Sequence, residues 1–212
     1  MGRKSISHIR KPEILRHTYK VVEEEGFMGM TIGKIATRMG VNSGLLIHYF
    51  KSKEGLIMEM VEYLYKSSMT AYLEELKKYT TPRERLEGLL DMVFDTSGTM
   101  PQRDAVFWSC YAMGFRNDKI REKIKGLMGK FIAFGMAEIE AWEENGLVKV
   151  ADKEKAAATI LALSEGFGIL RNSVDDMATL KEIALFMKKS ALTALELQTL
   201  PGEPLVKSPC PG

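Results

Sequence analysis

Cysteine and histidine are scarce in this sequence, and long apolar runs are missing. Of the 2 cysteines, Cys110 lies in a helical pattern and Cys210 in a proline-rich tail, so a framework of disulfides is not expected. The 3 histidines have no cysteine or carboxylate at metal-ligand spacing, so neither a metal nor another cofactor is expected. Charge or glycine interrupts every apolar stretch, which argues against a membrane-spanning helix and against a membrane partner.

The N-terminus is positively charged but has no apolar segment behind it, so it is not a secretory signal. We therefore expect a cytoplasmic protein. With 212 residues, 45% of them hydrophobic, the chain can bury a core in one larger domain or two small ones. Cys110 is expected to be a small buried hydrophobe, with a redox sensor as the alternative.

Motifs of catalysis are missing as well. The sequence has no Gly-x-Ser-x-Gly, no His/Cys pair and no phosphate-binding glycine loop. Its acidic candidates lie next to lysines or loop signals and are typical of solvated faces: Glu138, Glu140, Glu143, Glu144, Asp175 and Asp176. We therefore do not expect an enzyme.

The net charge of +2 hides an asymmetry between the two ends of the chain. Residues 1–53 hold ten Lys or Arg and four Glu, a net +6, and the remainder holds twenty basic and twenty-four acidic residues, a net −4. A positive end on a negative body is typical of a nucleic-acid reader with a separate second domain.

Apolar residues recur at helical spacing almost everywhere, and no alternating strand pattern persists, so the fold is expected to be all-α with about nine helices. Start signals such as Thr31, Ser52 and Pro82, and stop signals such as Gly26 and Gly40, delimit them. The predicted helices cover 13–25, 32–39, 42–50, 53–79, 82–94, 102–115, 118–145, 152–172 and 179–198. We divide the chain into an N-terminal domain (1–53), a second helical domain (54–198) and a proline-rich tail (199–212).

The segment from residue 31 to residue 50 has the spacing of a helix-turn-helix. Two short helices are joined at Met39 to Asn42, where Gly40 supplies the positive φ that a tight turn needs. Five apolar residues are placed to form a small shared core: Ile35, Ala36, Val41, Leu46 and Phe50.

The second helix of such a motif enters the major groove of DNA. Its N-terminal residues are then nearest the base edges, although Asn42 also fits as a helix cap. His48, Tyr49 and Lys53 are placed to contact phosphates, and the basic arm before the first helix either follows the DNA backbone or is a solvated terminus. The candidate DNA-binding residues are Arg10, Thr31, Asn42, Ser43, Gly44, Leu45, His48, Tyr49 and Lys53.

This stretch resembles the TetR family of bacterial transcriptional regulators over about residues 10–60. The matching positions are Thr31, Ile35-Ala36, Gly40-Val41, Gly44, Tyr49-Phe50, Ser52-Lys53-Glu54 and Leu56. The family commonly has a phosphate-contacting tyrosine where this chain has Ile47. The run GLLIHYFKSKEGL is most similar to the BetI-like branch, as are Trp108 near Tyr111 and the later Glu165-Gly166-Phe167.

The resemblance implies that the second domain dimerises and binds a small molecule. The last two predicted helices carry wide apolar faces that pairing with a second copy would bury, and a monomer in which they are central is the alternative. The candidate ligand-binding residues are Phe107, Trp108, Tyr111, Phe115, Phe134, Trp142 and Phe167. Aromatic faces suit a quaternary ammonium ion or an apolar compound, and the sequence leaves that choice open.

The function expected is a homodimeric repressor that binds a palindromic double-stranded DNA operator and is released by a small-molecule inducer. Repression or activation, and the inducer itself, stay open. The alternative is a helical protein-interaction module that does not bind DNA.

Overall fold

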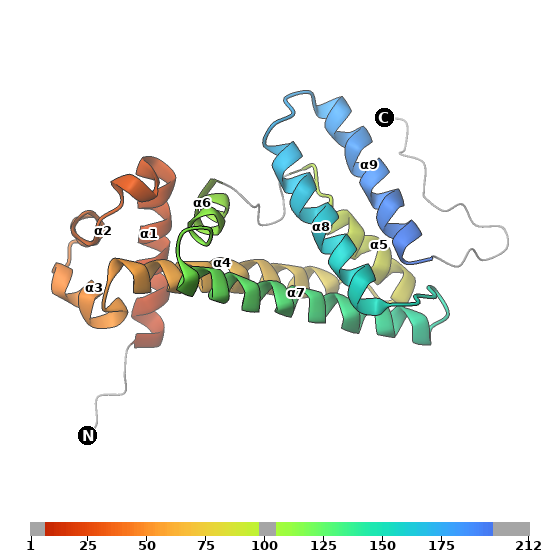
Figure 1. The fold of residues 1–212 in the computed structure, drawn as a ribbon, viewed down its shortest axis with the longest axis horizontal. Helices are drawn as coiled ribbons and strands as arrows, with labels where there is room; N and C mark the ends of the chain where they lie inside the picture. Colours follow the sequence, from red (N-terminus) through yellow and green to blue (C-terminus); the bar gives the residue numbers. More distant parts are fainter. Residues whose placement is uncertain (1–6, 98–104, 197–212) are drawn as a thin grey trace, which may run out of the picture. The chain divides into compact units, whose positions relative to one another are not determined.

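The computed structural model describes residues 7–97 and 105–196, and these residues are almost entirely α-helical (Figure 1). Within these ranges it has no strand, which agrees with the predicted all-α class. The helices are α1 (Ser7–Gly29), α2 (Ile32–Met39), α3 (Ser43–Phe50), α4 (Lys53–Leu76), α5 (Pro82–Val93), α6 (Ala105–Met113), α7 (Asp118–Glu144), α8 (Lys153–Arg171) and α9 (Met177–Ala194). None of the described helices combines the length and apolar character that a membrane span requires.

Helix α1 differs from the prediction at its N-terminal end. It begins at Ser7, whereas the prediction began it at residue 13, and it runs through Pro12. A proline ring holds φ near the helical value, but inside a helix it removes one backbone donor and crowds the carbonyl four residues earlier, so α1 includes Pro12 at a cost in stability. At the other end, Gly26 has φ 68° and breaks the helix where the stop was predicted, and one further turn follows.

The described chain forms two compact units. The first comprises residues 7–71 and 105–129, with α1, α2, α3, α6 and the first parts of α4 and α7; the second comprises residues 72–97 and 130–196. The first unit therefore contains the predicted DNA-binding segment together with pieces of later helices. The boundary at residue 53 stays a prediction, and the proline-rich tail lies outside the described residues.

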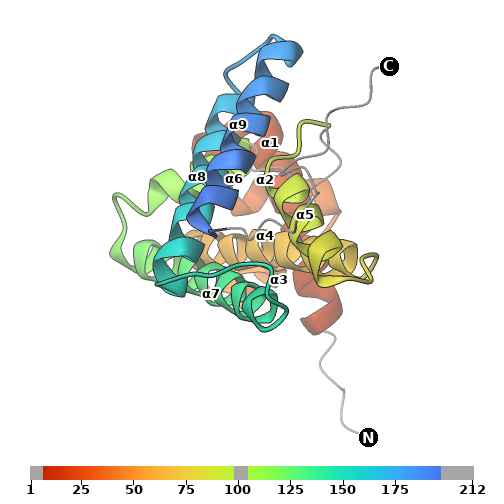
Figure 2. The ribbon, with the colours of Figure 1, turned by 90° about the vertical axis from the view of Figure 1, so that its right-hand side faces the viewer.

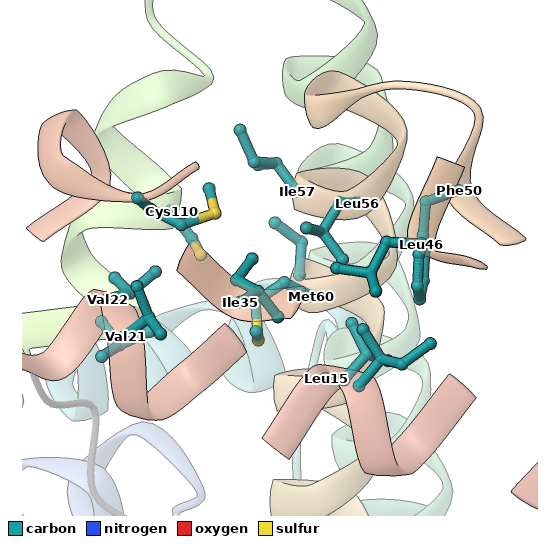
Figure 3. Close-up of a cluster of buried hydrophobic side chains, with 14 of the residues drawn as sticks. Leu15, Val21, Val22, Ile35, Leu46, Phe50, Leu56, Ile57, Met60 and Cys110 are labelled. Atoms are coloured by element: carbon teal, nitrogen blue, oxygen red, sulfur yellow. The ribbon is translucent and has the colours of Figure 1, made fainter. Parts of the chain in front are cut away.

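The core of the first unit joins α1, α2 and α3 to α4, α6 and α7 (Figure 3). Ile35, Leu46 and Met60 are completely buried in it. Cys110 of α6 is also buried there and packs among apolar side chains, as expected for a small hydrophobe. The helix-turn-helix is thus held by apolar contacts from helices on both sides of it in sequence.

The second unit has its own core around α5, α8, α9 and the last part of α7. Phe167 of α8 meets Phe94 edge to face, with ring centroids 5.8 Å apart. Helices α8 and α9 lie side by side (Figure 2). A forked ion pair joins Arg85 of α5 to Glu138 of α7, whose carboxylate is almost completely buried.

Candidate nucleic-acid interface

Helices α2 and α3 are joined by the tight turn that the sequence predicted. Gly40 takes the left-handed conformation, φ 65° and ψ 31°, and its N–H and that of Val41 donate to carbonyls at the end of α2. Asn42 caps α3: its Oδ1 accepts from the N–H of Gly44 at 2.7 Å. The turn therefore fixes where α3 starts and in which direction it runs.

Helix α3 has a buried face and an exposed face. Leu46 and Phe50 anchor it in the core of the first unit (Figure 3), and Lys11 lies 5.8 Å from the ring centroid of Phe50. Gly44 and His48 are exposed, and 49% of the Ile47 surface is accessible to solvent. Because residues three and four apart share a helix face, these three present one surface outward.

The other predicted contacts on α3 are partly buried. Ser43 is half-buried at its start, and Leu45 and Tyr49 pack partly against the core of the first unit. The rings of Tyr49 and His48 meet edge to face with centroids 5.4 Å apart. Each of these side chains keeps some surface toward solvent.

Thr31 and Asn42 each use one oxygen lone pair as a helix cap. Thr31 Oγ1 accepts from the N–H of Lys34 at 3.1 Å, which leaves its hydroxyl proton available to a phosphate. Asn42 likewise keeps its amide donor, because the capping bond uses only the carbonyl oxygen. Arg10 lies in α1, but its side chain is outside the described part of the chain.

Lys53 is held in a way that the sequence did not indicate. Its ammonium donates to the backbone carbonyl of Phe27, in the last turn of α1, at 3.1 Å and to that of Met30, directly after α1, at 2.7 Å. An ammonium has three donors, so one remains for an anion. Lys53 therefore links the first turn of α4 to the turn that precedes α2, in addition to the phosphate contact proposed for it.

The cations of α2 are paired with carboxylates of α1. Arg38 makes a forked ion pair with Glu24, with N–O distances of 2.5 and 2.9 Å, and Lys34 pairs with Glu25. The hydrogen bonds from Arg38 lower the pKa of Glu24, and those to Glu24 raise the pKa of Arg38. These pairs neutralise α2 and leave the basic character of the unit to other positions.

Lys51 is a candidate that the sequence reasoning missed. It follows α3 directly, adopts φ 66° and is exposed. The sequence could have indicated it, because a cation directly after the helix that enters the groove lies near the phosphates at the edge of that groove. Ile47 was treated only as the loss of a tyrosine, yet its exposed side chain suits a thymine methyl group.

The predicted ligand residues divide between the two units. Phe107, Trp108 and Tyr111 of α6 form a ladder of edge-to-face contacts, with centroids 5.2 and 6.2 Å apart, and Phe115 extends it from the turn after α6. In the second unit Phe134 is half-buried, and Trp142 and Phe167 are core residues with 2% of their surface exposed. The assignment of these seven residues to a ligand stays a prediction.

Two family models match the chain. Residues 14–60 match the model described as bacterial regulatory proteins, tetR family, and residues 81–197, more than half of the chain, match the tetracyclin repressor-like C-terminal domain. The first match covers α2 and α3 together with most of α1 and the first part of α4. Both agree with the resemblance found in the sequence.

Curated relatives include regulators of the predicted branch. The HTH-type transcriptional regulator BetI of Stenotrophomonas maltophilia (strain R551-3) is 29% identical over 121 residues, which cover 51% of this chain and 58% of the relative. That of Proteus mirabilis (strain HI4320) is 31% identical over 102 residues, which cover 47% of this chain and 50% of the relative. The chain thus spans between half and three fifths of the length of these relatives.

Solved structures share the fold at low sequence identity. A TetR-family transcriptional regulator from Cytophaga hutchinsonii is similar with a TM-score of 0.77 at 16% identity, covering 93% of this chain and all of that one. A putative transcriptional regulator from Saccharomonospora viridis in complex with choline has a TM-score of 0.70 at 18% identity, covering 91% of this chain and 100% of that one. Because both family models and these structures agree, the chain belongs to the TetR family of bacterial regulatory proteins.

Proposed function

We propose that this chain is a cytoplasmic transcriptional regulator that binds a palindromic operator as a homodimer and releases it when a small molecule binds. One observation carries the proposal: α3 stands on a buried base of Leu46 and Phe50, and its other face is open to solvent. A short helix held in this way can lie along the major groove. Gly44 lets a base or phosphate approach closely, and Ile47 and His48 lie on the same exposed face.

The contacts to DNA fall into two classes. Ser43, Leu45 and Ile47 are assigned to base edges, because they lie on α3 and keep surface toward solvent. Thr31, Asn42, His48, Tyr49, Lys51 and Lys53 are assigned to phosphates. The cap bonds of Thr31 and Asn42 and the carbonyl contacts of Lys53 each leave a donor available. Arg10 completes the set as a basic residue preceding these elements.

The test is selection of DNA from a random pool by the full-length protein, followed by titration in increasing salt. We expect a palindromic site and an affinity that falls linearly with the logarithm of the salt concentration, because bound phosphates release counterions. Replacement of Leu45 by alanine should change the preferred sequence, and replacement of Lys51 should weaken binding to all sequences. Failure to select any DNA would favour a protein-interaction module instead.

Homodimer formation through α8 and α9 rests on apolar surface that a monomer leaves in water. Phe186 of α9 has 71% of its surface exposed and Ile169 of α8 has 53%, although both helices also bury a face in their own unit. If α8 and α9 of one copy pack against α8 and α9 of a second copy, this surface is buried in a symmetric interface. Two copies of α3 would then reach successive major grooves, roughly 34–36 Å apart.

Replacement of Phe186 by aspartate is expected to convert the dimer to a monomer at micromolar concentration, because the new carboxylate would have to be buried without a partner. Sedimentation velocity measures the change. Phe115 provides a matched control: it is as exposed, at 77%, but lies outside α8 and α9, so its aspartate variant should remain dimeric. A dimeric Phe186 variant would refute this interface.

The proposed ligand site includes the aromatic ladder of α6. Trp108 Nε1 is buried and has no hydrogen-bond acceptor within the described structure, so a ligand oxygen could accept its proton. Aromatic faces also attract quaternary ammonium ions. Choline combines both features, and the Saccharomonospora viridis protein binds it, so choline is the first probe for release of the selected DNA.

A further inference from the structure

The first turn of α4 touches three other parts of the first unit through three consecutive residues. Lys53 reaches carbonyls at the end of α1 and directly after it. Glu54 reaches the start of α7, and Gly55 lies against the end of α3. Any displacement of this turn therefore affects its contacts with α1, α3 and α7 together.

The contact of Gly55 with α3 leaves no space for adjustment. A Cβ atom at this position would lie 2.1 Å from the carbonyl oxygen of Phe50, the last residue of α3. Only Lys51 and Ser52 separate the two helices, and Ser52 Oγ accepts from the N–H of Gly55 at 3.0 Å. The last residue of α3, the two linking residues and the first turn of α4 thus form one rigid unit, which we call the α3–α4 corner.

Asn117 connects this corner to α7 through two separate atoms. Its Oδ1 accepts from the N–H of Ile120, at 3.1 Å, and so caps the first turn of α7. Its Nδ2 donates to Glu54 Oε1 at 2.7 Å, across 63 residues of sequence. Lys119 adds an ion pair with Glu54 at 3.4 Å.

A helix cap needs only an acceptor at this position, so the donor bond to Glu54 is a separate function of the amide. Aspartate and serine cap helices as well as asparagine does. Neither has an N–H group in the place of Asn117 Nδ2 that could donate to Glu54 while the cap is kept. The bond to Asn117 is also the largest cause of the lowered pKa of Glu54, so the acceptor is a carboxylate at neutral pH. The choice of asparagine is thus explained by the contact with α4.

We propose that Asn117 is a positioning residue that, through its bond to Glu54, holds the α3–α4 corner in the orientation that sets the half-site spacing of the operator. This inference rests on the proposed function as a dimeric DNA-binding regulator. The amide contacts no DNA itself. It determines how far the corner can rotate about α7, and hence which separation of two α3 helices is preferred.

The polarity of the bond allows a test by exchange of donor and acceptor. N117D keeps the cap of α7 but places two carboxylates against each other, so it breaks the bond to Glu54. E54Q keeps an acceptor for the Asn117 amide and serves as a matched control that loses only the ion pair with Lys119. The double variant E54Q/N117D restores one bond in the opposite direction, because the new glutamine donates to the new aspartate. N117S breaks the bond without adding charge.

The experiment measures dissociation constants of the full-length variants for the DNA site selected by the wild-type protein, and for sites with one base pair added or removed between the half-sites. We expect the wild type to lose at least about tenfold in affinity on altered spacing, since half-site separation is set by the geometry of the dimer. N117D and N117S should lose less than about threefold on altered spacing, and E54Q and the double variant should discriminate as the wild type does. The thermal unfolding midpoint of the double variant should stay within about 2 °C of the wild type, because the cap is kept and one bond between residues 54 and 117 is restored.

The outcomes separate this inference from the proposed function. If the wild type selects no DNA, the proposed function fails, and this inference fails with it. If the wild type discriminates spacing and N117D does so equally, the proposed function stands and the positioning role is refuted. A loss of unfolding midpoint in both Asn117 variants without a change in spacing preference, or no recovery in E54Q/N117D, would equally refute it by reducing Asn117 to a structural cap.

Discussion

Replacement of Gly55 by alanine is expected to reduce affinity for the selected DNA site by at least about tenfold and to lower the free energy of unfolding by about 1–3 kcal/mol. The added Cβ would meet the carbonyl oxygen of Phe50 at 2.1 Å. A backbone oxygen at the end of a helix cannot rotate away as a flexible side chain can, so α3 and α4 must separate. The base-contacting face of α3 would tilt with them.

Gly126 of α7 is the control for this prediction. It lies in the same compact unit, is helical as Gly55 is, and a Cβ there would meet nothing within 4 Å. Alanine at that position should therefore stabilise the helix by up to about 1 kcal/mol and leave DNA affinity unchanged. Isothermal titration measures the DNA affinity of both variants, and thermal unfolding measures their stability. Equal DNA affinity in the two would contradict a rigid corner between α3 and α4.

The sequence predicted the helix boundaries well where the signals act over three or four residues. Thr31 and Asn42 cap the helices they were expected to cap, and Thr81 forms a capping box before Pro82. Gly40 takes the positive φ inferred for the turn. A cap or a turn satisfies backbone groups next to it in the chain, so its residue type is visible locally.

Contacts between distant residues could not be predicted in the same way. Lys53 was expected to meet an anion, and nothing in the sequence indicated that its ammonium also meets two carbonyls that lie more than twenty residues earlier. The bond from Asn117 to Glu54 joins an asparagine that looks like an ordinary cap to a half-buried glutamate. Neither residue carries a signal of its partner, because the packing of α4 against α1 and α7 creates both contacts.

The candidate ligand residues illustrate a second limit. Aromatic side chains at helical spacing indicate a cluster, but periodicity does not distinguish a core from a cavity wall. Trp142 and Phe167 lie in the core of the second unit, whereas Phe107, Trp108 and Tyr111 form a partly exposed ladder in the first. A choice between core and binding surface needs the burial of each side chain.

Replacing Arg85 and replacing Glu138, the two partners of one ion pair, should lower the free energy of unfolding by different amounts. The guanidinium bonds both carboxylate oxygens, at 2.7 and 2.6 Å, and the side chains are 34% and 9% exposed respectively. Replacement of Arg85 by methionine leaves a carboxylate that water hardly reaches, and should lower the free energy of unfolding by about 3–5 kcal/mol. Replacement of Glu138 by glutamine leaves a cation that water does reach and an amide oxygen that still accepts, so about 1–2 kcal/mol should be lost.

The chain contains 2 tryptophans, and one lies in each compact unit, so a Trp108→Phe background makes Trp142 the reporter of the second unit. Urea unfolding followed by its fluorescence measures the three variants at neutral pH. The double replacement of Arg85 by methionine and Glu138 by leucine should lie within about 1 kcal/mol of the parent, because no buried charge remains and apolar contacts replace the pair. Equal losses from the glutamine and methionine variants would contradict the asymmetry expected from the burial of the Glu138 carboxylate.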